Sequence, residues 1–257
     1  MKITEIERLP AGDYPGDEFD DDEMRRDKAL LRRSKYVPGH KGFFWTVANI
    51  YDTKSIVILN SEHIYPKDWY DENSDQQTSK VAPAIIAQLG LEDKVNIPGA
   101  KMYQVGTIAV RKEYRGRGLG TALYLIALQQ LKLWLMAGDS QTPGGRHAWI
   151  SLHSIPGVEV DGLFMVSKDE LNNPYRWGSD PDAVRRFDAL VDQLMAIGFN
   201  HIGDASGYHC FLFPVKRGKG ELMAAVRKAK FKLYQGWQGG DGHWDEDVSL
   251  IARWTGK

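Results

Sequence analysis

One glycine-rich run, residues 105–123, constrains what this chain can fold into more than any other part of it. The run reads VGTIAVRKEYRGRGLGTAL: an apolar, β-branched segment, then three glycines at alternate positions, then an apolar stretch. That order predicts a strand, a tight turn and the start of a helix. Glycines let a backbone approach a ligand closely, and the N–H groups at a helix start bind phosphate oxygens. The run therefore predicts a phosphate-binding turn, in which Arg115 and Arg117 add charge-assisted donors.

The spacing of the glycines separates this turn from two common phosphate-binding loops. Gly116, Gly118 and Gly120 alternate, so they do not give the G-x-G-x-x-G spacing of a dinucleotide-binding fold. No Lys-Ser or Lys-Thr pair follows them, so the run is not a Walker A loop. A nucleotide-binding protein of another fold and an ordinary tight turn stay open as alternatives.

The residues around the turn resemble a known family. A strand that ends in Val110 and leads to Arg115, Gly118 and Gly120 resembles motif A of the GNAT (GCN5-related N-acetyltransferase) superfamily, R/Q-x-x-G-x-G/A. Farther along, Gly198-Phe199 is similar to the helix end that GNAT chains show after their fourth helix. The resemblance spans roughly residues 1–217, and its specific parts are residues 102–137 and 180–215.

The resemblance implies an α/β GNAT fold, a mixed central sheet flanked by helices. It would carry insertions at residues 66–100 and 155–179 and a helical C-terminal extension. We therefore expect a GNAT acyltransferase-like domain over residues 1–217 and the extension over residues 218–257. Either the extension binds a protein partner, or a homodimer forms through it.

The resemblance also implies acetyl-CoA as cosubstrate, lying between two splayed strands. One strand would end at Val110 and the other would lie near Leu152. Main-chain groups of the first strand would pair with the pantetheine arm, and the turn would hold the pyrophosphate. The residues expected to bind the cosubstrate are Ile108, Ala109, Val110, Arg115, Gly116, Arg117, Gly118, Leu119, Gly120 and Thr121.

Two positions depart from the family pattern. Many GNAT enzymes have a glutamate base on the motif A strand, where this chain has Gln104, and a tyrosine acid where this chain has Leu194. His153, predicted at the end of a strand facing the cleft, is a substitute base, and Tyr208 is a substitute acid; for each, a packed or surface residue is the alternative. We expect an N-acetyltransferase whose acceptor is a small amine, a peptide or a protein. The alternative is a non-catalytic GNAT-fold protein that binds CoA or a protein partner.

The remaining elements follow from periodicity and from the positions of glycine and proline. Acidic residues before basic ones predict a helix that begins near Asp20, with a disordered acidic arm as the alternative. The other predicted elements are a hairpin of strands at 43–51 and 55–64, helices at 81–91, 118–137, 180–197 and 222–233, strands at 3–9, 102–110, 148–154 and 208–215, and irregular chain at 155–179.

Composition narrows the class of protein further. The formal net charge is -1, so no global field would gather nucleic acid or an anionic membrane. The single cysteine, Cys210, excludes an intrachain disulfide, and its apolar neighbours predict a buried side chain. No apolar stretch approaches the roughly 20 residues of a membrane span, and Met1 begins no signal-like segment. We therefore expect a cytoplasmic protein, and the spacing of its histidines predicts no metal site.

Overall fold

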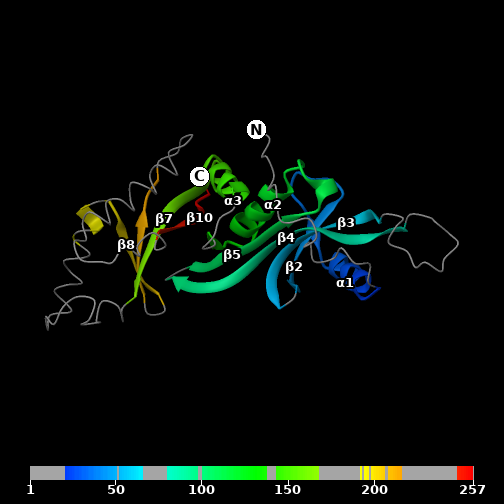
Figure 1. Cartoon of the computed structure of the whole chain (residues 1–257), viewed down its shortest axis with the longest axis horizontal. Helices are drawn as coiled ribbons and strands as arrows, with labels where there is room; N and C mark the ends of the chain where they lie inside the picture. Colours follow the sequence, from blue (N-terminus) through cyan, green and yellow to red (C-terminus); the bar gives the residue numbers. More distant parts are fainter. Residues whose placement is uncertain are drawn as a thin grey trace. The chain divides into compact units, whose positions relative to one another are not determined.

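The chain forms two compact units in a computed structural model (Figure 1). Unit 1 comprises residues 1–92, 105–130 and 142–144, and unit 2 comprises residues 93–104, 131–141 and 145–257. The structure describes residues 21–50, 52–65, 80–97, 100–137, 143–167, 192, 194–196, 198–205, 208–215 and 248–256. The strand predicted at 3–9 and the helix predicted at 222–233 lie outside these residues, as does all of the helix predicted at 180–197 except residues 192 and 194–196, which are helical.

The sheet of unit 1 contains β1, β2 and β3, followed by the parts of β4 and β5 that belong to this unit, residues 80–92 and 105–110. Its antiparallel strands begin with the short β1 (Lys35–Tyr36) and the predicted hairpin of β2 (Phe43–Ile50) and β3 (Thr53–Tyr65). The hairpin prediction is confirmed, and its turn places Asp52 at φ 61°, a left-handed conformation that aspartate tolerates better than most residues. The sheet continues into β4 (Lys80–Ile97) and β5 (Ala100–Val110).

Both faces of the unit 1 sheet are covered, because every residue from Ile56 to Leu59 on β3 is fully buried. The helix predicted near Asp20 is confirmed as α1 (Asp21–Arg32), and its Leu30 packs in one apolar cluster with Val57 and Leu59. Successive strand residues point to opposite faces, so Ile56 and Ile58 point away from α1. α2 (Leu119–Leu125), which contacts β3, supplies the second layer.

The helix predicted at 81–91 is wrong: these residues belong to β4, which pairs with β3 from Lys54↔Leu91 to Tyr65↔Lys80. An apolar run without period fits a buried helix and a buried strand equally well, and pairing with β3 decides between them. A register shift next to Ile85 lets side chains reach the β4 backbone. The Ile85 N–H donates to buried Asp27 Oδ2 at 3.0 Å, and its carbonyl accepts from Arg111 Nε at 2.9 Å.

The long helix predicted at 118–137 is shorter in the structure. Helical residues run from α2 through a π-helical turn, η3 (Ile126–Gln130), and the chain then enters β6 (Trp134–Met136). Lys132 lies between them with φ 55°, which reverses the chain. The apolar residues at 133–137 continue the helical pattern in sequence, but residues 134–136 form a strand, in which Leu135 and Met136 are buried.

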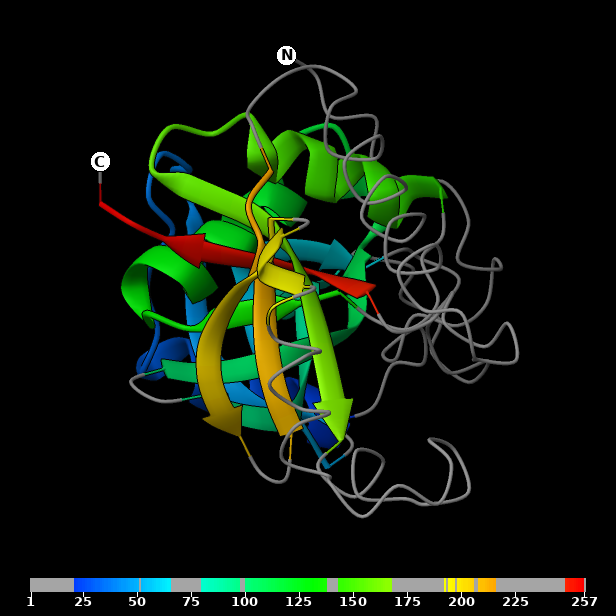
Figure 2. The ribbon, with the colours of Figure 1, turned by 90° about the vertical axis from the view of Figure 1, so that its left-hand side faces the viewer.

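The sheet of unit 2 has the order β5-β6-β10-β7-β9-β8, to which β5 contributes its residues 100–104. Figure 2 shows β7 (Val158–Ser167), β9 (Tyr208–Phe213) and β8 (Asn200–Ala205) side by side, and β9 confirms the strand predicted at 208–215. β10 (Val248–Trp254) is antiparallel to both β6 and β7. Arg253 of β10 binds Glu159 and Asp161 of β7 at 3.0 Å each, and burial raises the pKa of Asp161 while Arg253 opposes that rise.

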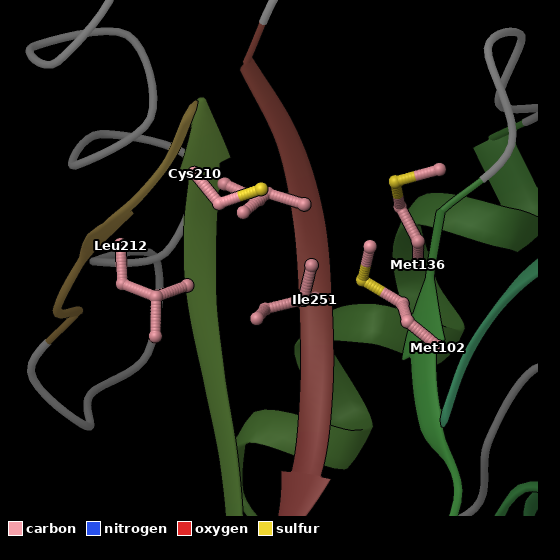
Figure 3. Close-up of a cluster of buried hydrophobic side chains, with 6 residues drawn as sticks. Met102, Met136, Cys210, Leu212 and Ile251 are labelled. Atoms are coloured by element: carbon pink, nitrogen blue, oxygen red, sulfur yellow. The ribbon is translucent and has the colours of Figure 1, made fainter. Parts of the chain in front are cut away.

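The core of unit 2 contains sulfur-bearing and aliphatic side chains from five strands (Figure 3). Cys210 is fully buried there, as its apolar neighbours predicted. The members of this cluster are Met102, Met136, Leu163, Cys210, Leu212 and Ile251. Ile251 comes from β10, so residues beyond 217 contribute to this sheet and its core. The domain boundary predicted at residue 217 adjoins residues 216–247, which lie outside the described part of the chain.

Two further predictions for unit 2 are wrong and one is confirmed. Residues 148–153 of the strand predicted at 148–154 form the end of α3 (Pro143–His153) instead, and residues 158–167, expected to be irregular, form β7. The predicted helix end at Gly198 is confirmed: Gly198 has φ 99°, and the Phe199 N–H donates to Leu194 O at 2.9 Å. Among the described residues, no helix combines the length and apolarity needed to cross a bilayer.

Candidate functional site

The glycine-rich turn lies between β5 and α2 and depends on two left-handed glycines. Gly116 has φ 76° and Gly118 has φ 77°. A Cβ added at Gly116 would meet no atom within 4 Å, and one added at Gly118 would meet only His40 Cε1, at 3.6 Å. Glycine is therefore needed here for its backbone conformation, and the space beside the turn is open for a ligand.

The start of α2 presents backbone donors to that space. The first helical hydrogen bond runs from the Ala122 N–H to the Gly118 carbonyl at 3.0 Å. The N–H groups of Leu119, Gly120 and Thr121 precede this ladder, so they have no acceptor within the helix. Donors of this kind, at the positive end of a helix dipole, bind anionic oxygens. The start of α2 therefore has the backbone donors that the predicted pyrophosphate site requires.

Basic side chains surround the turn. Arg115 and Arg117 are exposed, and Arg115 Nε donates to the carbonyl of Val110 at 3.1 Å, which ties the turn to the end of β5. The guanidinium of Arg117 lies 5.1 Å from the centre of the Tyr114 ring. An arginine held in this way keeps further N–H donors directed outward, which suits a diphosphate.

The last residues of β5 offer a strand edge next to the turn. β5 pairs in parallel with β6 at Met102, Tyr103 and Gln104 and, among the described residues, no farther. The Arg111 N–H donates to Ile86 O on β4 at 2.9 Å. Because main-chain groups alternate in direction along a strand, those of Ile108 and Val110 point away from β4. Their direction is the one that the sequence-based prediction required for pairing with an extended ligand.

A buried hydrogen-bond network, which the sequence alone did not predict, supports the turn. The Tyr114 hydroxyl accepts from Asn60 Nδ2 at 2.9 Å and lies 2.8 Å from Nδ1 of His63, a side chain only 2% exposed. Burial lowers the pKa of His63, the charge of Arg111 lowers it further, and Glu113 partly offsets both. The signal in the sequence is the pair of polar residues Asn60 and His63 in an otherwise apolar strand. Their common partner, Tyr114, lies more than fifty residues away in the sequence.

A pocket of about 320 Å³ adjoins the turn along one face of α2. Apolar side chains line most of it, and His40 and the amides of Gln129 and Gln130 provide its polar groups. Its volume lies at the lower end of the range for small-molecule sites. The full lining is Pro38, His40, Gly118, Thr121, Ala122, Leu125, Ile126, Gln129 and Gln130.

The predicted acid and base residues belong to unit 2. His153 is the last residue of α3 and is 2% exposed, so the predicted strand facing a cleft does not exist. The prediction of a strand near Leu152 is wrong, because Leu152 belongs to α3, and the strand that pairs in parallel with β5 is β6. Tyr208 begins β9. The two replaced family positions, Gln104 and Leu194, are both buried, and the described residues contain no group of three or more His, Cys, Asp or Glu that could hold a metal.

Comparison with known proteins identifies the segment that contains the turn. Residues 28–142 match the Acetyltransferase (GNAT) family. A GCN5-related N-acetyltransferase from Kribbella flavida is similar at 12% identity over 78% of this chain, with a TM-score of 0.27. This chain spans 60% of that protein's length. No curated protein matches the sequence. The matched segment includes β5, the glycine-rich turn and α2, the run whose residues resemble motif A of this family.

Proposed function

We propose that this chain is an N-acetyltransferase that transfers the acetyl group of acetyl-CoA to an amine. Its family supports acetyl transfer in general. The observation that carries the proposal is the turn itself. Gly116 and Gly118 hold left-handed conformations with open space beside them, and the chain passes from Gly118 directly into the first N–H groups of α2. An anionic diphosphate is the ligand that such a surface suits best.

The roles of the chain's residues follow from this geometry. The N–H groups of Leu119 to Thr121 and the guanidinium of Arg115 would bind the pyrophosphate. The outward main-chain groups of Ile108 and Val110 would pair with the amides of the pantetheine arm. The carbonyl of Val110 already accepts a hydrogen bond from Arg115 Nε, which ties the end of the strand to the turn. The acetyl thioester would then lie farther back along β5.

The acceptor amine is a small molecule, a peptide N-terminus or a protein lysine. A lysine-type amine has a reference pKa of about 10.4 and is protonated at neutral pH. A base or a desolvated site must therefore remove its proton before it attacks the thioester. The single cysteine suits a reducing compartment, which supports a cytoplasmic location.

The experiment that tests this function is calorimetry with acetyl-CoA, followed by an assay for free CoA. Acetyl-CoA is expected to bind and to raise the melting temperature, since a ligand of the native state stabilises it. Gly118→Asp is expected to abolish binding, by blocking the approach to the backbone and adding a repelling charge. Gly256→Asp is the matched control, because Gly256 has φ 74° but does not belong to the turn. No binding at millimolar acetyl-CoA would refute the proposal.

A second candidate, a GNAT-fold protein that binds CoA without catalysis, is favoured by one specific observation. Gln104 and Leu194 replace the usual base and acid, both are buried, and neither an amide nor an alkyl side chain can transfer a proton in this role. A panel of spermidine, tryptamine and a lysine-containing octapeptide separates the two functions. Strong acetyl-CoA binding without CoA release from any of them favours the binding protein, whereas release above the hydrolysis background favours the enzyme.

A further inference from the structure

We infer that Glu92 is the general base for acetyl transfer, an inference that rests on the function proposed above. Glu92 is an exposed residue of β4 within unit 1, the unit that contains the glycine-rich turn. Its carboxylate lies directly against Gly106 of β5. A Cβ added to Gly106 would lie 3.0 Å from Glu92 Cδ and 3.3 Å from Glu92 Cγ, and Oε1 is the nearest atom of all.

The contact with Glu92 explains why position 106 is a glycine, whereas the backbone conformation of this residue does not. Glycine weakens a strand interior, and there it often marks a place where another group approaches closely. Gly106 does not have the positive φ that would require a glycine. Its missing side chain leaves room for the Glu92 carboxylate, which any larger residue would displace. The pair Glu92 and Gly106 therefore behaves as one feature of the site.

Counting along β5 places the thioester at the same residue. From its phosphate oxygen to its sulfur, the pantetheine arm has about 12 bonds, the length of about four residues of extended chain. With the pyrophosphate at the turn that follows Val110, four residues back along β5 is Gly106. Gly106 and Thr107 are consecutive exposed residues of β5, in contrast to the buried residues 102–105. The acetyl group and the Glu92 carboxylate thus meet at one accessible point.

The chemistry needs a proton acceptor at this point. The acceptor ammonium gives one proton to the Glu92 carboxylate, and the freed nitrogen lone pair forms a C–N bond to the thioester carbon. The C–S bond breaks, its electron pair leaves with sulfur, and the second nitrogen proton ends on the CoA thiolate. Glu92 then returns its proton to water. Gln104, two residues before Gly106 on the same strand, carries an amide, which cannot accept a proton in this way.

Affinity labelling with bromoacetyl-CoA tests the position of Glu92 without knowledge of the acceptor. In the full-length protein, the Glu92 carboxylate oxygen is expected to displace bromide, forming a C–O bond as the C–Br bond breaks. Peptide mass spectrometry should find this ester on Glu92 in the parent, and should not find it in Glu92→Gln or with excess acetyl-CoA present. Reagent that competes with acetyl-CoA but labels another residue, or labels none, overturns the inference.

Kinetics test the role of Glu92 with whichever amine of the panel the parent acetylates. Glu92→Gln is expected to lower kcat about 100-fold or more at pH 7, the usual scale for a lost general base, with acetyl-CoA affinity within twofold of the parent. The deficit should shrink as the pH rises toward the pKa of the amine, because free amine needs no base. Glu62→Gln, at an exposed glutamate of β3, is the matched control and should retain activity.

The outcomes separate the two proposals. If the parent binds no acetyl-CoA, or releases CoA with none of the amines, the proposed function fails and the role of Glu92 fails with it. If the parent is active and Glu92→Gln keeps more than a third of its kcat at pH 7, or loses the same factor at every pH, only the role of Glu92 fails.

Gly106→Ala provides an independent check, because its added Cβ must push the Glu92 carboxylate aside. The flexible end of Glu92 can move, so we expect the variant to fold. It should lower kcat in the parent but have little effect once Glu92 is alanine, since the two changes remove the same interaction. Equal losses from Gly106→Ala in both backgrounds would overturn the inference.

Discussion

Replacing single glycines of the turn by alanine gives a sharp test of its geometry, because three neighbouring positions predict opposite effects. Gly116 and Gly118 have φ near 76° and 77°, where an L-residue is strained, whereas Gly120 lies in α2 without a positive φ. The added Cβ is not obstructed at any of them. Its nearest neighbour would be His40 Cε1 at 3.6 Å for Gly118 and Ile108 Cδ1 at 3.8 Å for Gly120.

Backbone conformation therefore decides the sign of each change. Gly116→Ala and Gly118→Ala should each destabilise the protein by about 1–2 kcal/mol, the usual difference for an L-residue in the left-handed helical region. Gly120→Ala should stabilise it by about 0.5–1 kcal/mol, because alanine loses less backbone freedom in a helix. The two kinds of variant should differ by about 1.5–3 kcal/mol, or roughly 3–12 °C in melting temperature for a chain of this size.

The assay is thermal and urea unfolding of the three variants without ligand, followed by acetyl-CoA titration of each. Gly116→Ala serves as the reference for pure backbone strain, since its Cβ meets no atom within 4 Å. If Gly118→Ala proves as stable as Gly120→Ala, the turn does not adopt the left-handed conformation on which the phosphate site depends. The reasoning from φ would then be refuted, whatever the ligand experiments show.

Three further predictions concern the surroundings of the turn. Asp27→Ala should lower the free energy of unfolding by about 1–3 kcal/mol in urea titrations, because it leaves the Ile85 N–H without its acceptor. Asp27→Asn keeps an oxygen acceptor and should lose less stability. Equal losses in the two variants would contradict this. Since burial lowers the pKa of His63, the parent should lose stability as the pH falls below about 6.5, where the unfolded histidine takes up a proton. Unfolding measured between pH 5 and 8 should show a weaker dependence for His63→Gln, and parallel curves would disprove this. Arg115→Ala should weaken acetyl-CoA binding by roughly 1.5–3 kcal/mol in calorimetry, and an unchanged Kd would show that its side chain does not reach the cosubstrate.

Local patterns made the glycine-rich turn predictable, while non-local contacts hid much of the rest. A strand, a glycine turn and a helix start each leave a signature within a few residues, so β5 and the beginning of α2 follow from residues 102–123. The β4 segment around Pro83 has an apolar run without period, and only pairing with β3 makes it a strand. The apolar neighbours of His153 likewise fit a strand or a helix, and in the structure they belong to α3.

Glu92 illustrates why the site could not be completed from sequence. It stands fourteen positions before Gly106, and a count of residues gives no sign that β4 carries its carboxylate to that glycine. The contact of Tyr114 with Asn60 and His63 is equally distant in sequence. Both pairs depend on which strands are neighbours and in which register, and that information exists only once the sheet has formed.

Because β10 lies between β6 and β7, unit 2 is suited to a strand-complementation experiment. Val248 pairs with Phe164 and Trp254 pairs with Val158, so the strand joins residues that lie more than eighty positions apart in the sequence. Until it docks, β6 and β7 both present unpaired edges, which are templates for another strand. A chain that lacks residues 248–254 would therefore accept a synthetic peptide of that sequence by β-augmentation. Such a peptide, carrying a fluorophore next to Trp254, would convert the assembly of this sheet into a binding reaction that can be timed.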